Sequence, residues 1–113
     1  DKIQVLSGDD ALSLPMYGLG ATGVISVASN VAPKQMSDLY RLYQAGDHVG
    51  ARELQARLNP LFVTLFVEPN PQPAKCALAL MGEMNNVLRM PLHPATSNTQ
   101  SRLADIVGSL GLL

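Results

Sequence analysis

The chain has 113 residues, of which 47% are hydrophobic and 15% charged, so an ordered apolar core is expected rather than disorder. Its formal net charge is -1 and its Lys and Arg residues are scattered singly, which argues against a nucleic-acid partner. The single cysteine, Cys76, excludes an internal disulfide, and no apolar run reaches the ~18 residues of a membrane-spanning helix, so we expect a cytoplasmic protein without a membrane partner.

The N-terminal part of the chain predicts a strand, a helix and a second strand. An apolar strand is expected over 2–6, and it ends in Ser7-Gly-Asp-Asp10. Asp9 or Asp10 can cap the helix expected over 11–19, because a carboxylate suits the unpaired amides at a helix start. A continuous β-branched strand is expected over 23–27. Two strands joined through one helix run parallel, so this part predicts a βαβ unit.

The rest of the chain is predicted to be helical. Asn30 is expected to cap a helix that carries apolar residues at helical spacing and closes near Gly46. Further helices are expected over 49–66, 74–81 and 99–110. Two strands followed by helices leave both sheet edges open, which a monomer rarely tolerates. The chain is therefore interpreted as a piece of something larger.

Three segments together resemble the C-terminal part of the dihydrodipicolinate synthase family. They are Ser7-Gly-Asp-Asp10, Gly23-Val-Ile-Ser-Val-Ala-Ser-Asn-Val-Ala-Pro33 and Leu65-Phe-Val-Glu-Pro-Asn-Pro-Gln-Pro-Ala-Lys75. The resemblance implies an α/β fold that is mostly helical: the C-terminal part of a (β/α)8 TIM barrel plus an all-α C-terminal domain. Residues 1–46 would be the last two β/α units, with two parallel strands, and residues 47–113 the helical domain. Sialic acid lyases share this architecture but are less similar in these segments.

The resemblance also implies an activity for the parent protein. Family members are lyases without a cofactor that hold pyruvate as a Schiff base on a lysine and condense it with aspartate semialdehyde in lysine (diaminopimelate) biosynthesis. They form homo-oligomers, to which the helical domain contributes. The chain would begin after the family's catalytic lysine, so it is expected to be inactive alone and to carry no catalytic residue. Its lysines, Lys2, Lys34 and Lys75, are interpreted as surface or structural residues because none lies inside an apolar strand.

Two residues match positions beside the family's pyruvate pocket. The backbone carbonyl at the position of Ile25 would face bound pyruvate, and Gly8 would allow a close approach because it lacks a Cβ. The resemblance favours this role for Ile25. For Gly8 it leaves a plain turn residue equally open. Both are predicted as substrate-binding residues.

Other readings of the sequence compete with this one. Adjacent carboxylates at Asp9 and Asp10 could hold Mg2+ in a receiver-like phospho-acceptor, but a capping role is favoured. His48 and His93 lie far apart without further ligands at metal-site spacing, so no metal site is expected. Cys76 is interpreted as a small buried hydrophobic residue. The main alternative function is a non-catalytic helical association module.

Overall fold

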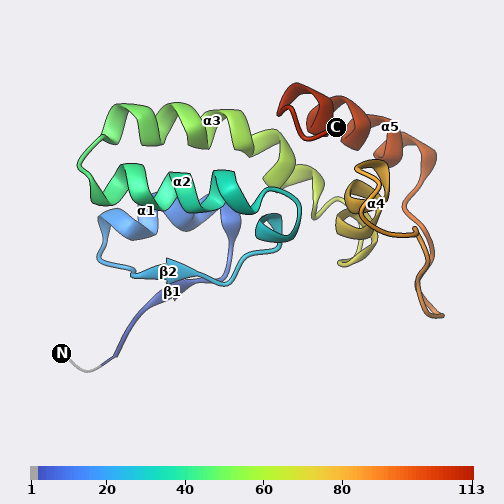
Figure 1. Ribbon diagram of the computed structural model, residues 1–113. Coiled ribbons are helices and arrows are strands. Elements are labelled where there is room, and N and C mark those ends of the chain that lie inside the picture. Colours follow the sequence, from blue (N-terminus) through green and yellow to red (C-terminus); the bar gives the residue numbers. More distant parts are fainter. Residues whose placement is uncertain (1–2) are drawn as a thin grey trace. The chain divides into compact units, whose positions relative to one another are not determined.

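The computed structural model describes residues 3–113, so Lys2 lies outside the described residues. By its internal contacts the chain divides into two compact units, residues 1–59 and residues 60–113. Figure 1 labels the helices and strands that each unit contains. The described part of the chain contains two short parallel strands and five α-helices, which confirms the mostly helical character expected from the sequence.

The first unit opens with the predicted strand–helix–strand arrangement. Strand β1 (Leu6–Ser7) pairs in parallel with β2 (Gly23–Val24), with Leu6 opposite Gly23 and Ser7 opposite Val24. Between the strands lie a 3-10 turn, Asp10–Leu12, and helix α1 (Ser13–Gly18). Helix α1 contacts both strands and α2, and Figure 1 shows it between them. The predicted βαβ unit is confirmed.

Both strands are shorter than the sequence suggested. The predicted strand over 23–27 ends at Val24, although the ladder continues one bond further because the Ile25 amide donates to the Ser7 carbonyl at 2.8 Å. Val27 has a helical backbone conformation, with φ -81° and ψ -43°, and its amide donates to the Asp10 side chain. A two-stranded sheet also gives each strand only one hydrogen-bonding neighbour, which limits its regular length.

Helix α2 (Pro33–Gln44) begins after a 3-10 turn at Ala28–Asn30. The expectation that Asn30 caps this helix is wrong: the residue at the cap position is Ala32, and the Asn30 amide group donates to the Val27 carbonyl at 3.0 Å. Pro33 explains the shift, since a proline suits the first helical position, where no amide donor is needed.

The first unit continues into helix α3 (His48–Thr64), of which residues 48–59 belong to it. The chain enters this helix after Gly46, whose φ of 79° is a conformation that favours glycine. The core of the unit lies among its helices and the turn before α2. Its buried apolar residues are Tyr17, Ala21, Ala28, Val31, Ala32, Met36, Leu39, Ala51 and Leu58.

The second unit contains the end of α3 together with α4 (Gln72–Leu80) and α5 (Ser97–Ser109), which pack against each other. Their bounds lie close to the predicted helices. Cys76 is buried, as expected, and burial together with the charge of Glu68 raises the pKa of its thiol. The buried apolar residues of this unit are Leu61, Phe62, Leu65, Ala74, Cys76, Ala77, Ala95, Leu103, Ile106 and Val107.

A carboxylate fixes the start of α5. The Thr96 amide donates to both oxygens of Glu68 at 3.1 and 3.2 Å, and the Thr96 hydroxyl donates to Oε1 at 2.8 Å. Hydrogen bonds from Thr99 and Thr96 hold the pKa of Glu68 below its ordinary value. Glu68 thus supplies, from a distant part of the sequence, the cap that no local side chain gives this helix.

Within the described residues, no helix is both long and apolar enough to cross a membrane.

Candidate functional site

The two predicted substrate-binding residues lie together at one end of the small sheet. Gly8 directly follows Ser7, and Ile25 directly follows Val24, which are the last paired residues of β1 and β2. Both therefore follow the carboxyl end of a parallel strand, the edge where barrel enzymes place their active-site groups. Adding a Cβ to Gly8 would meet no atom of the described residues within 4 Å. The space beside Gly8 is open on the side where a side chain would project.

Ile25 differs from the buried strand residue that its sequence context suggests. Its residue surface is 70% exposed, while its amide is bound to the Ser7 carbonyl. Among the described residues, no donor reaches its carbonyl oxygen. This carbonyl, unbonded within the described part of the chain, is available to an incoming hydrogen-bond donor, since an exposed backbone acceptor needs no partner within the chain.

Asp10 connects the loop after β1 to the loop after β2. Its Oδ2 accepts hydrogen bonds from the amides of Val27 and Ala28, at 3.1 and 2.9 Å. The residue is 1% exposed. This buried carboxylate therefore joins backbone groups 17 and 18 positions away in the sequence.

Asp9 has a different and purely local role. Its Oδ1 accepts the amide of Ala11 at 2.8 Å, which caps the 3-10 turn at Asp10–Leu12 and confirms that one carboxylate of the pair caps this segment. The two neighbouring carboxylates thus serve different loops. Neither the receiver-like hypothesis nor a shared Mg2+ gains support, because each carboxylate already accepts backbone amides.

Both described lysines donate to oxygen atoms of the chain. Lys34 is an exposed residue of α2 that pairs with Asp38, and Arg41 pairs with the same carboxylate. These two cations lower the pKa of Asp38, chiefly through the hydrogen bond from Lys34. Lys75 donates to the carbonyl of Val87. The Lys34 side chain is 79% exposed and the amine of Lys75 is held by a backbone carbonyl, so neither lysine resembles a nucleophile enclosed in an apolar pocket.

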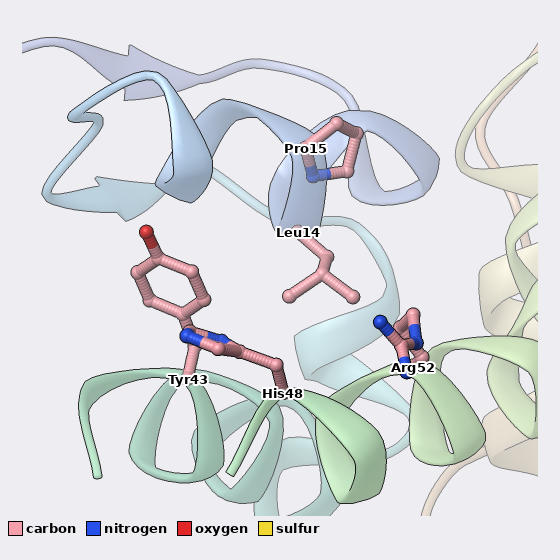
Figure 2. A pocket seen from close by; sticks show the side chains of 5 residues that line it. All are labelled: Leu14, Pro15, Tyr43, His48 and Arg52. Atoms are coloured by element: carbon pink, nitrogen blue, oxygen red, sulfur yellow. The ribbon is translucent and has the colours of Figure 1, made fainter. Parts of the chain in front are cut away.

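A separate hollow of about 290 Å3 lies in the first unit, and Figure 2 shows the side chains that line it. The imidazole of His48 lies against the ring of Tyr43, with 5.3 Å between ring centroids. The remaining lining residues are Leu14, Pro15 and Arg52. This lining offers apolar surface and an arginine but neither a carboxylate nor a lysine, so it cannot hold the predicted imine chemistry.

The comparisons with known proteins agree with the three sequence segments. Residues 1–110 match the profile of the dihydrodipicolinate synthetase family. The chain belongs to the dihydrodipicolinate synthetase family. A 4-hydroxy-tetrahydrodipicolinate synthase from Nitratidesulfovibrio vulgaris (strain DP4) is 50% identical over 110 residues, which are 97% of this chain and 38% of that protein. One from Thermotoga neapolitana is 49% identical over 109 residues, covering 96% of this chain and 37% of that protein.

Solved structures of the family match the same stretch. The dihydrodipicolinate synthase of Thermotoga maritima has a TM-score of 0.94 and 46% identity, covering 97% of this chain and 37% of that one. The chloride-inhibited enzyme of Acinetobacter baumannii, solved with pyruvate, has a TM-score of 0.92 and 37% identity, covering 99% of this chain and 38% of that one. The chain thus spans little more than a third of the length of its relatives. The resemblance predicted from the sequence is confirmed.

The sequence reasoning missed two features of this family member. It treated Asp9 and Asp10 as interchangeable caps, whereas only Asp10 reaches the second loop. The βαβ pattern could have predicted the contact of Asp10 with the second loop, since residues that follow neighbouring parallel strands meet at one edge of the sheet. It also missed the contact of His48 with Tyr43, for which the turn at Gly46 between two helices was the only hint.

Proposed function

We propose that this chain is the C-terminal part of a 4-hydroxy-tetrahydrodipicolinate synthase, a cytoplasmic lyase of lysine (diaminopimelate) biosynthesis. The parent enzyme condenses pyruvate, held as an imine on a lysine, with aspartate semialdehyde. The observation that carries the proposal is the 50% identity to such a synthase across 97% of the chain. The pyruvate named for the Acinetobacter baumannii structure gives additional support for this substrate.

Within the parent enzyme, the first unit would contribute the last two β/α units of the barrel and one wall of the pyruvate pocket. The unpaired carbonyl of Ile25 would face bound pyruvate, and Gly8 would leave room beside it. Their positions directly after β1 and β2 support this assignment, because parallel barrels place substrate groups at the carboxyl ends of their strands. The boundary proposed from the sequence, residues 1–46 as barrel and 47–113 as helical domain, belongs to the same proposal.

The imine-forming lysine would lie outside this chain. Lys34 is paired with Asp38 and Lys75 is bound to a backbone carbonyl, so neither is prepared for nucleophilic attack. The chain alone would therefore lack turnover, although it would supply part of the pocket. Association into homo-oligomers, partly through the helical domain, is part of the proposal.

The direct test is an assay of the full-length protein that contains this chain. Purified enzyme should consume pyruvate and aspartate semialdehyde together, and omission of either substrate should stop the reaction. Turnover with pyruvate and an amino sugar, but none with aspartate semialdehyde, would instead indicate a related pyruvate lyase.

The role of Ile25 can be tested in the same assay. Ile25→Val keeps the backbone carbonyl, so the KM for pyruvate should change by less than about twofold, as expected for an exposed side chain that makes no substrate contact. A large rise in that KM, with the melting temperature unchanged, would show that the side chain of Ile25 matters.

The alternative of a non-catalytic association module predicts a different result. The full-length protein would then assemble into oligomers but show no pyruvate-dependent turnover. The 50% identity to a synthase across 97% of the chain favours the synthase over this alternative.

A further inference from the structure

The short segment around Ile25 is held at one end by the last residue of β1 and at the other end by the loop that follows β1. On one side, the Ile25 amide donates to the Ser7 carbonyl at 2.8 Å. On the other side, the amides of Val27 and Ala28 donate to Oδ2 of Asp10. Only the carbonyls of Ile25 and Ser26 lie between these two anchors. The orientation of the Ile25 carbonyl therefore depends on both of them.

We propose that Asp10 is a positioning residue for the reaction: through its hydrogen bonds to Val27 and Ala28 it orients the Ile25 carbonyl toward pyruvate bound as the protonated imine, whose nitrogen can donate a hydrogen bond. The inference rests on the proposed function, since it assigns Asp10 a role in the same pocket. Asp10 does not touch pyruvate in this account. Its effect passes through the backbone of the loop after β2.

The first anchor cannot fix the carbonyl without the second. A single bond from the Ile25 amide leaves the following peptide free to rotate about its backbone dihedrals, which are the soft degrees of freedom of a chain. Asp10 restricts that freedom by binding two consecutive amides with one oxygen, and the Ser26 hydroxyl and carbonyl, which accept hydrogen bonds from Ser29, restrict it further. These amides begin the 3-10 turn at Ala28–Asn30, where a negative charge is favourable.

The burial of Asp10 indicates that its role is specific. The residue is 1% exposed, and its Oδ1 accepts no hydrogen bond from the described residues. Burial of a carboxylate costs free energy unless its hydrogen bonds compensate. If the side chain at position 10 only had to fill space, an apolar side chain would do so without that cost. The two bonds to Val27 and Ala28 are what an apolar side chain could not reproduce.

The test compares three variants of the full-length enzyme. Asp10→Ala removes both bonds to the loop and should raise the KM for pyruvate by about tenfold, the effect of losing one hydrogen bond to the bound substrate. Asp10→Asn is isosteric and keeps an acceptor at the Oδ2 position, so its KM should stay within about threefold of wild type. Asp9→Ala is the matched control, because it removes a neighbouring carboxylate that, among the described residues, accepts a hydrogen bond from the Ala11 amide alone.

The pattern of kinetic constants separates positioning from a merely structural role. Loss of folded protein would lower kcat per total enzyme but leave the KM for pyruvate unchanged, whereas displacement of the carbonyl raises that KM and leaves the KM for aspartate semialdehyde near wild type. If Asp10→Ala does not fold, Asp10→Glu replaces it, since its extra methylene group pushes the carboxylate against the two amides and should also raise the KM for pyruvate.

Either of two results would overturn the proposal: a folded Asp10→Ala or Asp10→Glu variant with the wild-type KM for pyruvate, or Asp9→Ala with an equal rise. Wild-type enzyme is assayed first, so that the two proposals can fail separately. If wild type shows no pyruvate-dependent turnover, the proposed function is wrong. If wild type turns over normally and the Asp10 variants keep its KM, only the positioning role is wrong.

Discussion

The small sheet of the first unit and the packed helices of the second unit differ in how completely their apolar residues are covered. In the first unit, residues beside the small sheet remain open to solvent: Ile3 is 89% exposed and Ile25 is 70% exposed. In the second unit, Leu61, Leu65 and Leu103 are fully buried among helices. The difference teaches that helices can cover one another within a short chain, whereas a two-stranded sheet needs further strands or helices on its faces and edges.

The largest effect is expected on the free energy of unfolding, when a buried leucine and an exposed leucine are each replaced by alanine. Leu103→Ala should lower the free energy of unfolding of the isolated chain by about 2–5 kcal/mol, because it removes a fully buried side chain and leaves a cavity. Leu19→Ala is the matched change in the first unit, at a residue that is 89% exposed. It should change the free energy of unfolding by less than about 0.5 kcal/mol. Urea unfolding followed by circular dichroism measures both. Equal losses would break the comparison.

The second prediction concerns association of the isolated chain. Burial of the open strand residues is worth about 25 cal/mol per Å2, so we expect the chain to form assemblies larger than its 12.0 kDa monomer at micromolar concentration. Size-exclusion chromatography with light scattering measures the mass. Ile3→Lys should weaken the association strongly, whereas Met90→Lys in the second unit, at a residue 77% exposed, should weaken it little. A compact monomer that melts cooperatively would contradict this prediction.

The helices and the two strand ends were largely predictable from the sequence. Apolar residues at helical spacing form one buried face of a helix, so the spacing predicts where each helix lies. Helices α2, α3, α4 and α5 were therefore predicted with bounds wrong by only a few residues. The three segments that identified the family also located Gly8 and Ile25 at neighbouring strand ends. Local pattern and strand order were sufficient for these features.

Other features depended on tertiary hydrogen bonds that no local pattern specifies. The bonds of Asp10 to Val27 and Ala28 span 17 and 18 positions, and the bonds of Glu68 to Thr96 span 28. Both carboxylates cap a distant turn or helix, whereas cap preferences in sequence describe only the adjacent residues. The strand over 23–27 was also predicted too long. β2 ends at Val24, and the Val27 amide forms a tertiary hydrogen bond with Asp10 that the local sequence does not predict.

The smallest expected effect concerns the carboxylate that caps α5. Glu68→Gln should lower the free energy of unfolding at neutral pH by about 1 kcal/mol or less, the range of a helix cap. Because the folded-state pKa of Glu68 lies below its ordinary value of 4.5, the contribution of its charge is present above that pH. It is lost as the pH falls through the lowered pKa, so the two proteins should converge in acid.

Urea unfolding of the isolated chain between neutral and acidic pH measures this convergence. Glu83→Gln is the control, since Glu83 is exposed and accepts no hydrogen bond from the described residues through its side chain. It should follow wild type across the whole pH range. A Glu68→Gln difference that is independent of pH would show that the charge of Glu68 does not contribute.

Under the proposed function, this chain forms part of a pyruvate-binding Schiff-base enzyme whose imine-forming lysine lies outside residues 1–113. The most direct measurement treats the full-length protein and the isolated chain with pyruvate and borohydride, which reduces an imine to a stable amine, and maps the adduct by peptide mass spectrometry. The full-length protein should carry one pyruvate on a lysine outside residues 1–113, and the isolated chain should carry none. An adduct on Lys2, Lys34 or Lys75, or no adduct on the full-length protein, would contradict the account.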